Sequence, residues 1–223
     1  EALATMTPAT LTWATGRCDL ATNRDLPDPD TSKGRFVCGY NPSAPADDTV
    51  LVGRVTRDAD SVILATIVNY ACHPTTLAWD NKLISTDYIG AMRQVIEQHT
   101  GAAPCLFLQG ASGELSPAHQ YVGDTRVADQ HGRRLGFSAL AALESMLPPG
   151  QKLSYQGVME SGAPLAVWRP TSFAPERDLG GTAISVQLPL KPMPSVPELE
   201  AQMAATDDRA LRERLFRKTQ IVK

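Results

Sequence analysis

The sequence lacks the features that mark membrane-spanning and nucleic-acid-binding proteins. Its longest apolar run, residues 61–72, contains Asn69 and Tyr70 and is shorter than the ~20 apolar residues that a spanning helix needs. Lys and Arg together number 21 against 24 Asp and Glu, so there is no excess of positive charge to attract phosphates. Aromatic residues make up only 6%, and no amphipathic membrane anchor stands out. We therefore predict neither a transmembrane segment nor a nucleic-acid partner.

Cysteine is scarce and widely spaced. The four cysteines, Cys18, Cys38, Cys72 and Cys105, form no C-x-x-C pair, which excludes zinc ribbons and zinc fingers. Cys72 and Cys105 lie in apolar, strand-like segments, where a buried thiol is expected. Cys18 and Cys38 flank a loop, and the sequence leaves open whether they form a disulfide.

The rest of the composition is typical of a globular protein, with 43% hydrophobic and 20% charged residues. We predict one α/β domain over residues 1–223, a mixed sheet flanked by helices, with 62–70 and 104–108 as buried central strands. Both ends of the chain fall in helical patterns without stop signals, which predicts a fragment of a larger unit. Further strands are predicted at 50–56, 153–168 and 184–190, and helices at 86–99, 125–146 and 197–216.

Residues 16–48 contain many prolines and Asx residues, which favour turns over regular structure. We predict a long proline-rich loop there, of which 23–45 wraps the surface. The helix at 86–99 is expected to be capped by Ser85 or Thr86, with Asp87 in its first turn, where negative charge is favourable.

The first segment with candidate chemistry is Asn-Tyr-Ala-Cys-His-Pro-Thr-Thr-Leu, residues 69–77. An apolar strand ends just before His73, at a place where α/β proteins commonly bind ligands. Imidazole is a common metal ligand and carries protons near neutral pH. The alternative is a structural histidine bonded to a backbone carbonyl. Of the other histidines, we expect His99 to be solvated, whereas His119 and His131 stay candidates.

The second segment is Gln-Gly-Ala-Ser-Gly-Glu-Leu-Ser-Pro, residues 109–117, which we call the serine loop. Its glycines allow positive φ and a close backbone approach, and amides around Ser112 and Gly113 could bind an oxyanion. The loop is neither a Walker loop nor a G-x-S-x-G nucleophile elbow. Ser116 supplies a second hydroxyl, for which the alternative is a turn serine bonded to the backbone.

Together these segments and Leu-Ile-Ser-Thr-Asp-Tyr-Ile-Gly (83–90) resemble the neutral/alkaline non-lysosomal ceramidase family, and its bacterial uncharacterised members most. The three motifs follow the family's order over residues 49–146. The resemblance implies a zinc-dependent amide hydrolase with this segment in its N-terminal catalytic domain. It matches His73 to a zinc-binding histidine, Ser116 to a serine nucleophile, Gly113 to the turn of the loop, and Asp87 to an aspartate without an assigned role.

The same resemblance implies a ceramide-like N-acyl lipid as substrate, a place in sphingolipid metabolism, and a secreted or periplasmic location. It places a second histidine ligand before Glu1, and a glutamate and a tyrosine ligand beyond Lys223. The chain departs from the family at three positions: Glu114 replaces an aspartate, and Ala111 and Ala118 replace asparagines.

Two other functional classes stay open from the sequence. The chain could be a catalytically silent domain that keeps the fold for binding, or part of a larger protein. It could also be a metal-free serine hydrolase, which requires His119 or His131, oriented by a carboxylate, beside Ser116. Whether water or serine attacks the amide, and the oligomeric state, are also open.

The sharpest prediction is that His73 and Ser116 face one pocket. If strands 62–70 and 104–108 are parallel neighbours joined by helix 86–99, their carboxyl ends lie at one edge of the sheet.

Overall fold

The computed structural model describes residues 2–178, 180–189 and 192–223. Contacts divide the chain into two compact units, Glu1–Glu176 and Arg177–Lys223, which are described separately below. The mixed sheet and the candidate site both belong to the first unit. A single domain that includes both units therefore stays a prediction.

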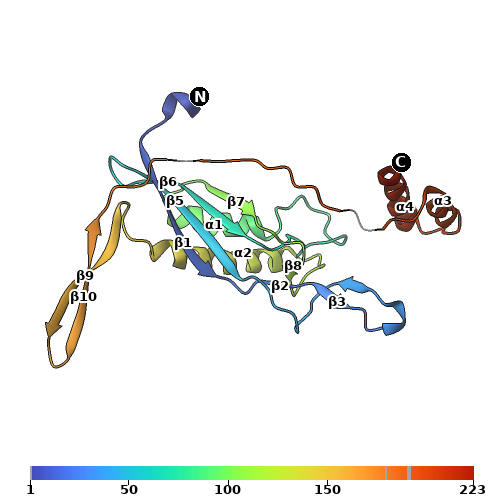
Figure 1. The fold of residues 1–223 in the computed structure, drawn as a ribbon, viewed down its shortest axis with the longest axis horizontal. Coiled ribbons are helices and arrows are strands. Elements are labelled where there is room, and N and C mark those ends of the chain that lie inside the picture. Colours follow the sequence, from blue (N-terminus) through green and yellow to red (C-terminus); the bar gives the residue numbers. More distant parts are fainter. Residues whose placement is uncertain (1, 179, 190–191) are drawn as a thin grey trace. The chain divides into compact units, whose positions relative to one another are not determined.

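The first unit is built on a four-stranded mixed sheet in the order β1-β5-β6-β7, as Figure 1 shows. Its strands are β1 (Ala9–Arg17), β5 (Thr49–Arg57), β6 (Ile63–Tyr70) and β7 (Cys105–Gln109). β5 pairs antiparallel with β1 and β6, whereas β6 and β7 run parallel. The predicted mixed sheet and the predicted parallel pair are both confirmed.

Two helices cover one face of this sheet. The chain between β6 and β7 includes α1 (Tyr88–His99), and α2 (Thr125–Glu144) packs against α1, β1 and β5. The helices approach closely because Gly132 and Gly136 of α2 face α1, where a Cβ on Gly132 would collide with the Tyr88 carbonyl. The core between the helices and the sheet includes Val50, Val52, Val68, Met92, Ile96 and Leu135.

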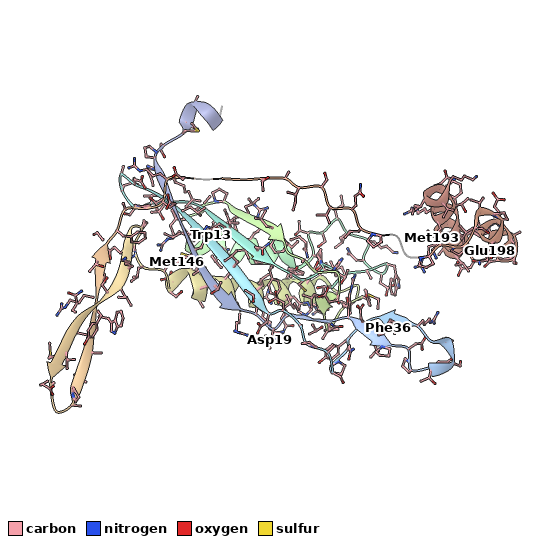
Figure 2. The ribbon with its side chains drawn as sticks, in the orientation of Figure 1. Trp13, Asp19, Phe36, Met146, Met193 and Glu198 are labelled. Carbon is pink, nitrogen blue, oxygen red and sulfur yellow. The ribbon has the colours of Figure 1, made fainter. Side chains whose placement is uncertain are left out.

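The opposite sheet face is apolar and open within the described part of the chain. Trp13 lies across Gly53, whose added Cβ would come within 2.8 Å of the indole ring (Figure 2). Leu106 and Leu108 of β7 are also exposed. The prediction that 104–108 is a buried central strand is therefore wrong in part: among the described residues β7 is an edge strand with one buried face. The strand was predicted to be buried because both of its faces carry apolar side chains, but only one of the two faces is covered.

The proline-rich segment contains more regular structure than predicted. Residues 16–48 include β2 (Ala21–Asn23), the hairpin of β3 (Asp25–Pro27) with β4 (Phe36–Cys38), and a short 3-10 helix, η2 (Thr31–Lys33). The hairpin is exposed, with Phe36 on its surface (Figure 2). All four cysteines are free thiols, of which Cys18, Cys72 and Cys105 are buried and Cys38 is exposed.

Several predicted boundaries need correction. The strand predicted at 153–168 is a hairpin of β9 (Gln151–Glu160) and β10 (Pro164–Ser172). β1 was missed, although its burial alternates along the whole strand, and a short 3-10 helix, η1 (Ala2–Thr5), precedes it. β8 (Leu115–Pro117), within the serine loop, pairs with β2.

In the second unit, the helix predicted at 197–216 is two helices, α3 (Val196–Ala204) and α4 (Arg209–Val222). The break comes at Thr206-Asp-Asp208, because the Asp208 carboxylate caps α4 by accepting the N–H groups of Ala210 and Leu211. Residues 184–189 form no strand, although apolar side chains alternate there, and residue 190 of that prediction lies outside the described residues. Alternation alone does not form a strand, which needs a partner for its backbone groups.

Candidate functional site

His73 follows the end of β6 and is held on the serine loop. Its backbone N–H donates to the Leu115 carbonyl at 2.9 Å. Its ring Nδ1 lies 2.6 Å from the Ser112 carbonyl oxygen and 3.2 Å from that of Leu115. Because carbonyl oxygens only accept hydrogen bonds, Nδ1 carries a hydrogen, and in the neutral ring Nε2 then keeps its lone pair. The ring of His73 is thus bonded to backbone carbonyls, as expected for a structural histidine. Metal-binding histidines commonly make the same kind of hydrogen bond, so this geometry fits both interpretations.

The serine loop lies directly against the residues that precede His73. The Gly110 N–H donates to the Tyr70 carbonyl at 3.0 Å, and a Cβ on Gly110 would meet Ala71 at 3.0 Å. A side chain at position 110 would therefore crowd Ala71, and glycine permits the close approach. The expected positive φ does not occur at either Gly110 or Gly113.

Ser116 lies in β8, opposite Thr22 of β2, whose hydroxyl donates to the Ser116 carbonyl at 2.9 Å. Its side chain is fully buried, and its Oγ has no hydrogen-bond partner among the described residues. The hydroxyl is therefore not bonded to the backbone, as a turn serine would be. His73 contacts the neighbouring residue, Leu115, so the serine loop and His73 are brought together. The shared pocket of His73 and Ser116 stays a prediction.

Gly113 lies at the exposed tip of this loop, whereas Ser112 beside it is buried. Arg24 donates from Nε to the Gly113 carbonyl at 3.0 Å, and the Ser112 hydroxyl oxygen accepts a hydrogen bond from Gln109 at 2.6 Å. The backbone N–H groups of Gly113 and Glu114 make no hydrogen bond within the described chain. These two amides are the candidate donors to an oxyanion.

Asp87 is the N-cap of α1, where the sequence predicted Ser85 or Thr86. Its carboxylate accepts the N–H groups of Tyr88 at 2.7 Å and of Leu77 at 2.8 Å, which ties the segment after His73 to the helix. Its backbone has φ 53° and ψ −142°, a conformation that costs a residue other than glycine about 1–3 kcal/mol. The buried carboxylate therefore holds a strained backbone next to the candidate site.

His131 and His119 form a second polar group beside the segment that follows His73. The His131 Nδ1 lies 3.0 Å from the Thr76 hydroxyl, and the His119 and His131 rings are 6.3 Å apart. Burial, and then the neighbouring His119, lower the pKa of His131. Neither histidine bonds the Ser116 hydroxyl, so the pairing of Ser116 with His119 or His131 that the metal-free alternative requires is not formed among the described residues. His99 lies at the exposed end of α1.

The donor set for a metal ion is incomplete in the part of the chain that the structure describes. That part contains no group of three or more His, Cys, Asp or Glu side chains able to hold a metal. A catalytic zinc needs three protein ligands, of which His73 could be one. Cys72, next to His73, is not a good thiolate ligand, because burial raises its pKa to about 12. The zinc predicted from the family resemblance therefore does not fit the described residues alone.

Two side chains that sequence reasoning missed hold the Cys72 carbonyl. The Tyr88 hydroxyl donates to it at 2.5 Å, and Gln109 Nε2 donates to it at 3.0 Å. Gln109 is the polar residue that ends the apolar strand β7, and this position was the one available signal in the sequence.

No protein-family model and no curated protein matches this sequence. Among solved structures, neutral ceramidase from Pseudomonas aeruginosa aligns with 69% of the chain at 19% identity and a TM-score of 0.51. The fold is similar to that of neutral ceramidase. A ceramidase complexed with C2 also aligns with 69% of the chain, at 18% identity and a TM-score of 0.51. The chain spans 26% of the length of each ceramidase structure, and at this identity the similarity concerns the fold alone.

Proposed function

We propose that this chain carries part of the active site of a hydrolase that cleaves an amide bond, with His73 and Ser116 as its catalytic residues. The observation that carries the proposal is the ring of His73, held by its Nδ1 hydrogen on the serine loop so that Nε2 keeps a free lone pair. The similarity of the fold to neutral ceramidase supports hydrolysis as the class of reaction.

In this proposal each group has a separate role. His73 accepts a proton at Nε2, either from the Ser116 hydroxyl or from a water molecule that attacks instead. The free N–H groups of Gly113 and Glu114 donate to the oxyanion that forms on the substrate carbonyl. Asp87 supports the site by tying the segment after His73 to α1. Because Ser116 is fully buried, the residues that cover it must shift for the substrate to reach it.

Zinc is the alternative use of the same lone pair, because an ion bound at His73 Nε2 would leave that nitrogen unable to accept a proton. The ion would polarise the amide carbonyl and lower the pKa of a bound water molecule. The described residues supply no second and third ligand, so none of the steps above passes through it.

The substrate in this proposal is a small-molecule or lipid amide, with an N-acyl lipid such as ceramide as the first candidate. Two neighbours in structure are ceramidases, which supports this choice. The described chain contains no helix that is both long and apolar enough to span a bilayer. A secreted or periplasmic location belongs to the proposal through the family resemblance.

A second candidate function is a catalytically silent domain that keeps this fold for binding. The observation that favours it is the incomplete donor set around His73. The two candidates make opposite predictions for the intact protein, since only the first requires turnover.

The test is an assay of the intact purified protein on fluorogenic N-acyl amides of short and long chain, each paired with the matching ester. We expect amide hydrolysis that falls roughly 100-fold or more in His73→Ala, which removes the proposed proton acceptor. The matched control is His99→Ala, at the exposed end of α1, which should keep wild-type activity. Stoichiometric zinc in the same preparation would support the enzyme, whereas a folded, metal-free and inactive protein would favour the silent domain.

A further inference from the structure

Gln109, the last residue of β7, joins the two segments of the candidate site. Its side-chain Nε2 donates to the Cys72 carbonyl at 3.0 Å and to the Ser112 hydroxyl oxygen at 2.6 Å. Cys72 directly precedes His73, and Ser112 is the residue whose carbonyl accepts the His73 Nδ1 hydrogen. One amide group therefore holds both sides of the contact that orients the imidazole.

The two hydrogen bonds use the full donor capacity of this amide. A primary carboxamide has two N–H hydrogens, and each has one acceptor here. The Cys72 carbonyl is also bonded by the Tyr88 hydroxyl at 2.5 Å, so the residue before His73 is fixed from both α1 and β7. Ser112 is buried and is held at two atoms: its carbonyl accepts the Leu115 N–H at 3.0 Å, and its hydroxyl oxygen is held by Gln109 alone among the described residues.

The position of Ser112 decides the protonation pattern of His73. Its carbonyl is the nearer of the two acceptors at Nδ1, at 2.6 Å against 3.2 Å for that of Leu115. If Ser112 moves away, only the longer contact remains, and the preference for a hydrogen on Nδ1 over Nε2 weakens. In the tautomer protonated at Nε2, the nitrogen that faces the reaction has no lone pair to accept a proton.

We propose that Gln109 is a positioning residue that keeps His73 in the tautomer protonated at Nδ1. It acts through Ser112 and Cys72 and does not touch the substrate. The use of the free Nε2 in catalysis rests on the proposed function, whereas the tautomer itself is a property of the folded protein and can be measured without any substrate.

The test is nitrogen-15 and carbon-13 NMR of the histidine rings in the intact protein, with the His73 signals assigned from the His73→Ala variant. Gln109→Met keeps the approximate length of the side chain and removes both donors. We expect the ratio of the Nδ1-protonated to the Nε2-protonated form of His73 to fall roughly fivefold, as for the loss of one typical hydrogen bond. The matched control, Gln98→Met on the exposed side of α1, should leave the ratio unchanged.

A second variant keeps the test valid if Gln109→Met does not fold. Ser112→Ala removes the hydroxyl that Gln109 holds but leaves the carbonyl that binds His73, so the ratio should again fall. If Gln109 acts through Ser112, a variant with both Gln109→Met and Ser112→Ala should change the ratio of His73 tautomers no more than Gln109→Met alone. An unchanged ratio in a folded Gln109→Met variant, or in Ser112→Ala, would overturn the proposal.

The activity of the same variants separates this inference from the proposed function. With an active wild type, Gln109→Met should lower kcat and leave KM nearly unchanged, because only the catalytic group is displaced. A shifted tautomer in a protein without amidase activity would support the role of Gln109 and contradict the hydrolase. An unshifted tautomer in an active enzyme would contradict the role of Gln109 alone.

Discussion

The imidazole of His73 donates its Nδ1 hydrogen to the backbone carbonyl of Ser112, 2.6 Å away, although 39 residues separate them in sequence. The contact results from the parallel pairing of β6 and β7, which places the segments after both strands at one edge of the sheet. Gly110 allows it, because the serine loop packs on Ala71 without a side chain between them. The local backbone thus determines which nitrogen of His73 is free.

The close packing of α1 on α2 depends on Gly132. We expect Gly132→Ala to destabilise the protein by about 1–3 kcal/mol, because the new Cβ would collide with the Tyr88 carbonyl and the Ala91 side chain. Urea unfolding measures the change. The control is Gly39→Ala, where an added Cβ meets nothing within 4 Å and φ is not in the left-handed region. Equal stabilities of the two variants would show that the helices do not pack this closely.

The strained backbone of Asp87 can be separated from its capping carboxylate. Asp87→Ala loses the cap and keeps the strain, whereas Asp87→Gly loses the cap and relieves the strain at φ 53°. We therefore expect the glycine variant to be the more stable of the two, by about 1 kcal/mol. Thermal unfolding of both variants measures which is the more stable. A more stable alanine variant would contradict the positive φ, and hence the backbone strain, at Asp87.

Acid should destabilise the first unit partly through His131. Burial and the neighbouring His119 lower its pKa below the ordinary value of 6.5, Arg134 acts in the same direction, and Asp87 opposes them. A lowered pKa means that the unfolded chain binds the proton first. This contribution to stability is therefore present above pH 6.5 and is lost as the pH falls towards the folded-state pKa.

Unfolding measured from pH 8 to pH 5 tests this expectation. His131→Gln should show a shallower loss of stability below pH 6.5 than the wild type. Gln130→Ala, a change at an exposed and uncharged neighbour, should keep the wild-type slope. An identical slope in His131→Gln would mean that His131 is not buried as a neutral ring.

Much of the sheet could be predicted from the sequence, because β5, β6 and α1 each carry a clear hydrophobic period. The edge position of β7 could not, since the exposed Leu106 and Leu108 resemble buried residues when only composition is considered. β1 was missed because Thr and Ala at alternate positions give a weak apolar signal, although Leu11 and Trp13 keep the period of a strand.

The candidate site was predictable as residue types but not as contacts. His73 and the serine loop were recognised from strand ends followed by polar residues and from the family resemblance. The roles of Gln109 and Tyr88 could not be predicted, because both act on the backbone carbonyl of Cys72, and a carbonyl leaves no mark on the sequence. The strain at Asp87 was hidden for the same reason, as φ is not readable from residue type.

The central claim is that His73 and Ser116 act as one catalytic unit. The most direct measurement is kcat/KM for amide hydrolysis by the intact protein with His73→Ala, Ser116→Ala and both changes together, each checked for folding. We expect kcat/KM to fall roughly 100-fold or more in each single variant. In the double variant it should fall no further than in the less active of the two single variants, because the effects of groups that act together are not additive. Wild-type activity in either folded single variant, or losses that multiply in the double variant, would contradict the claim.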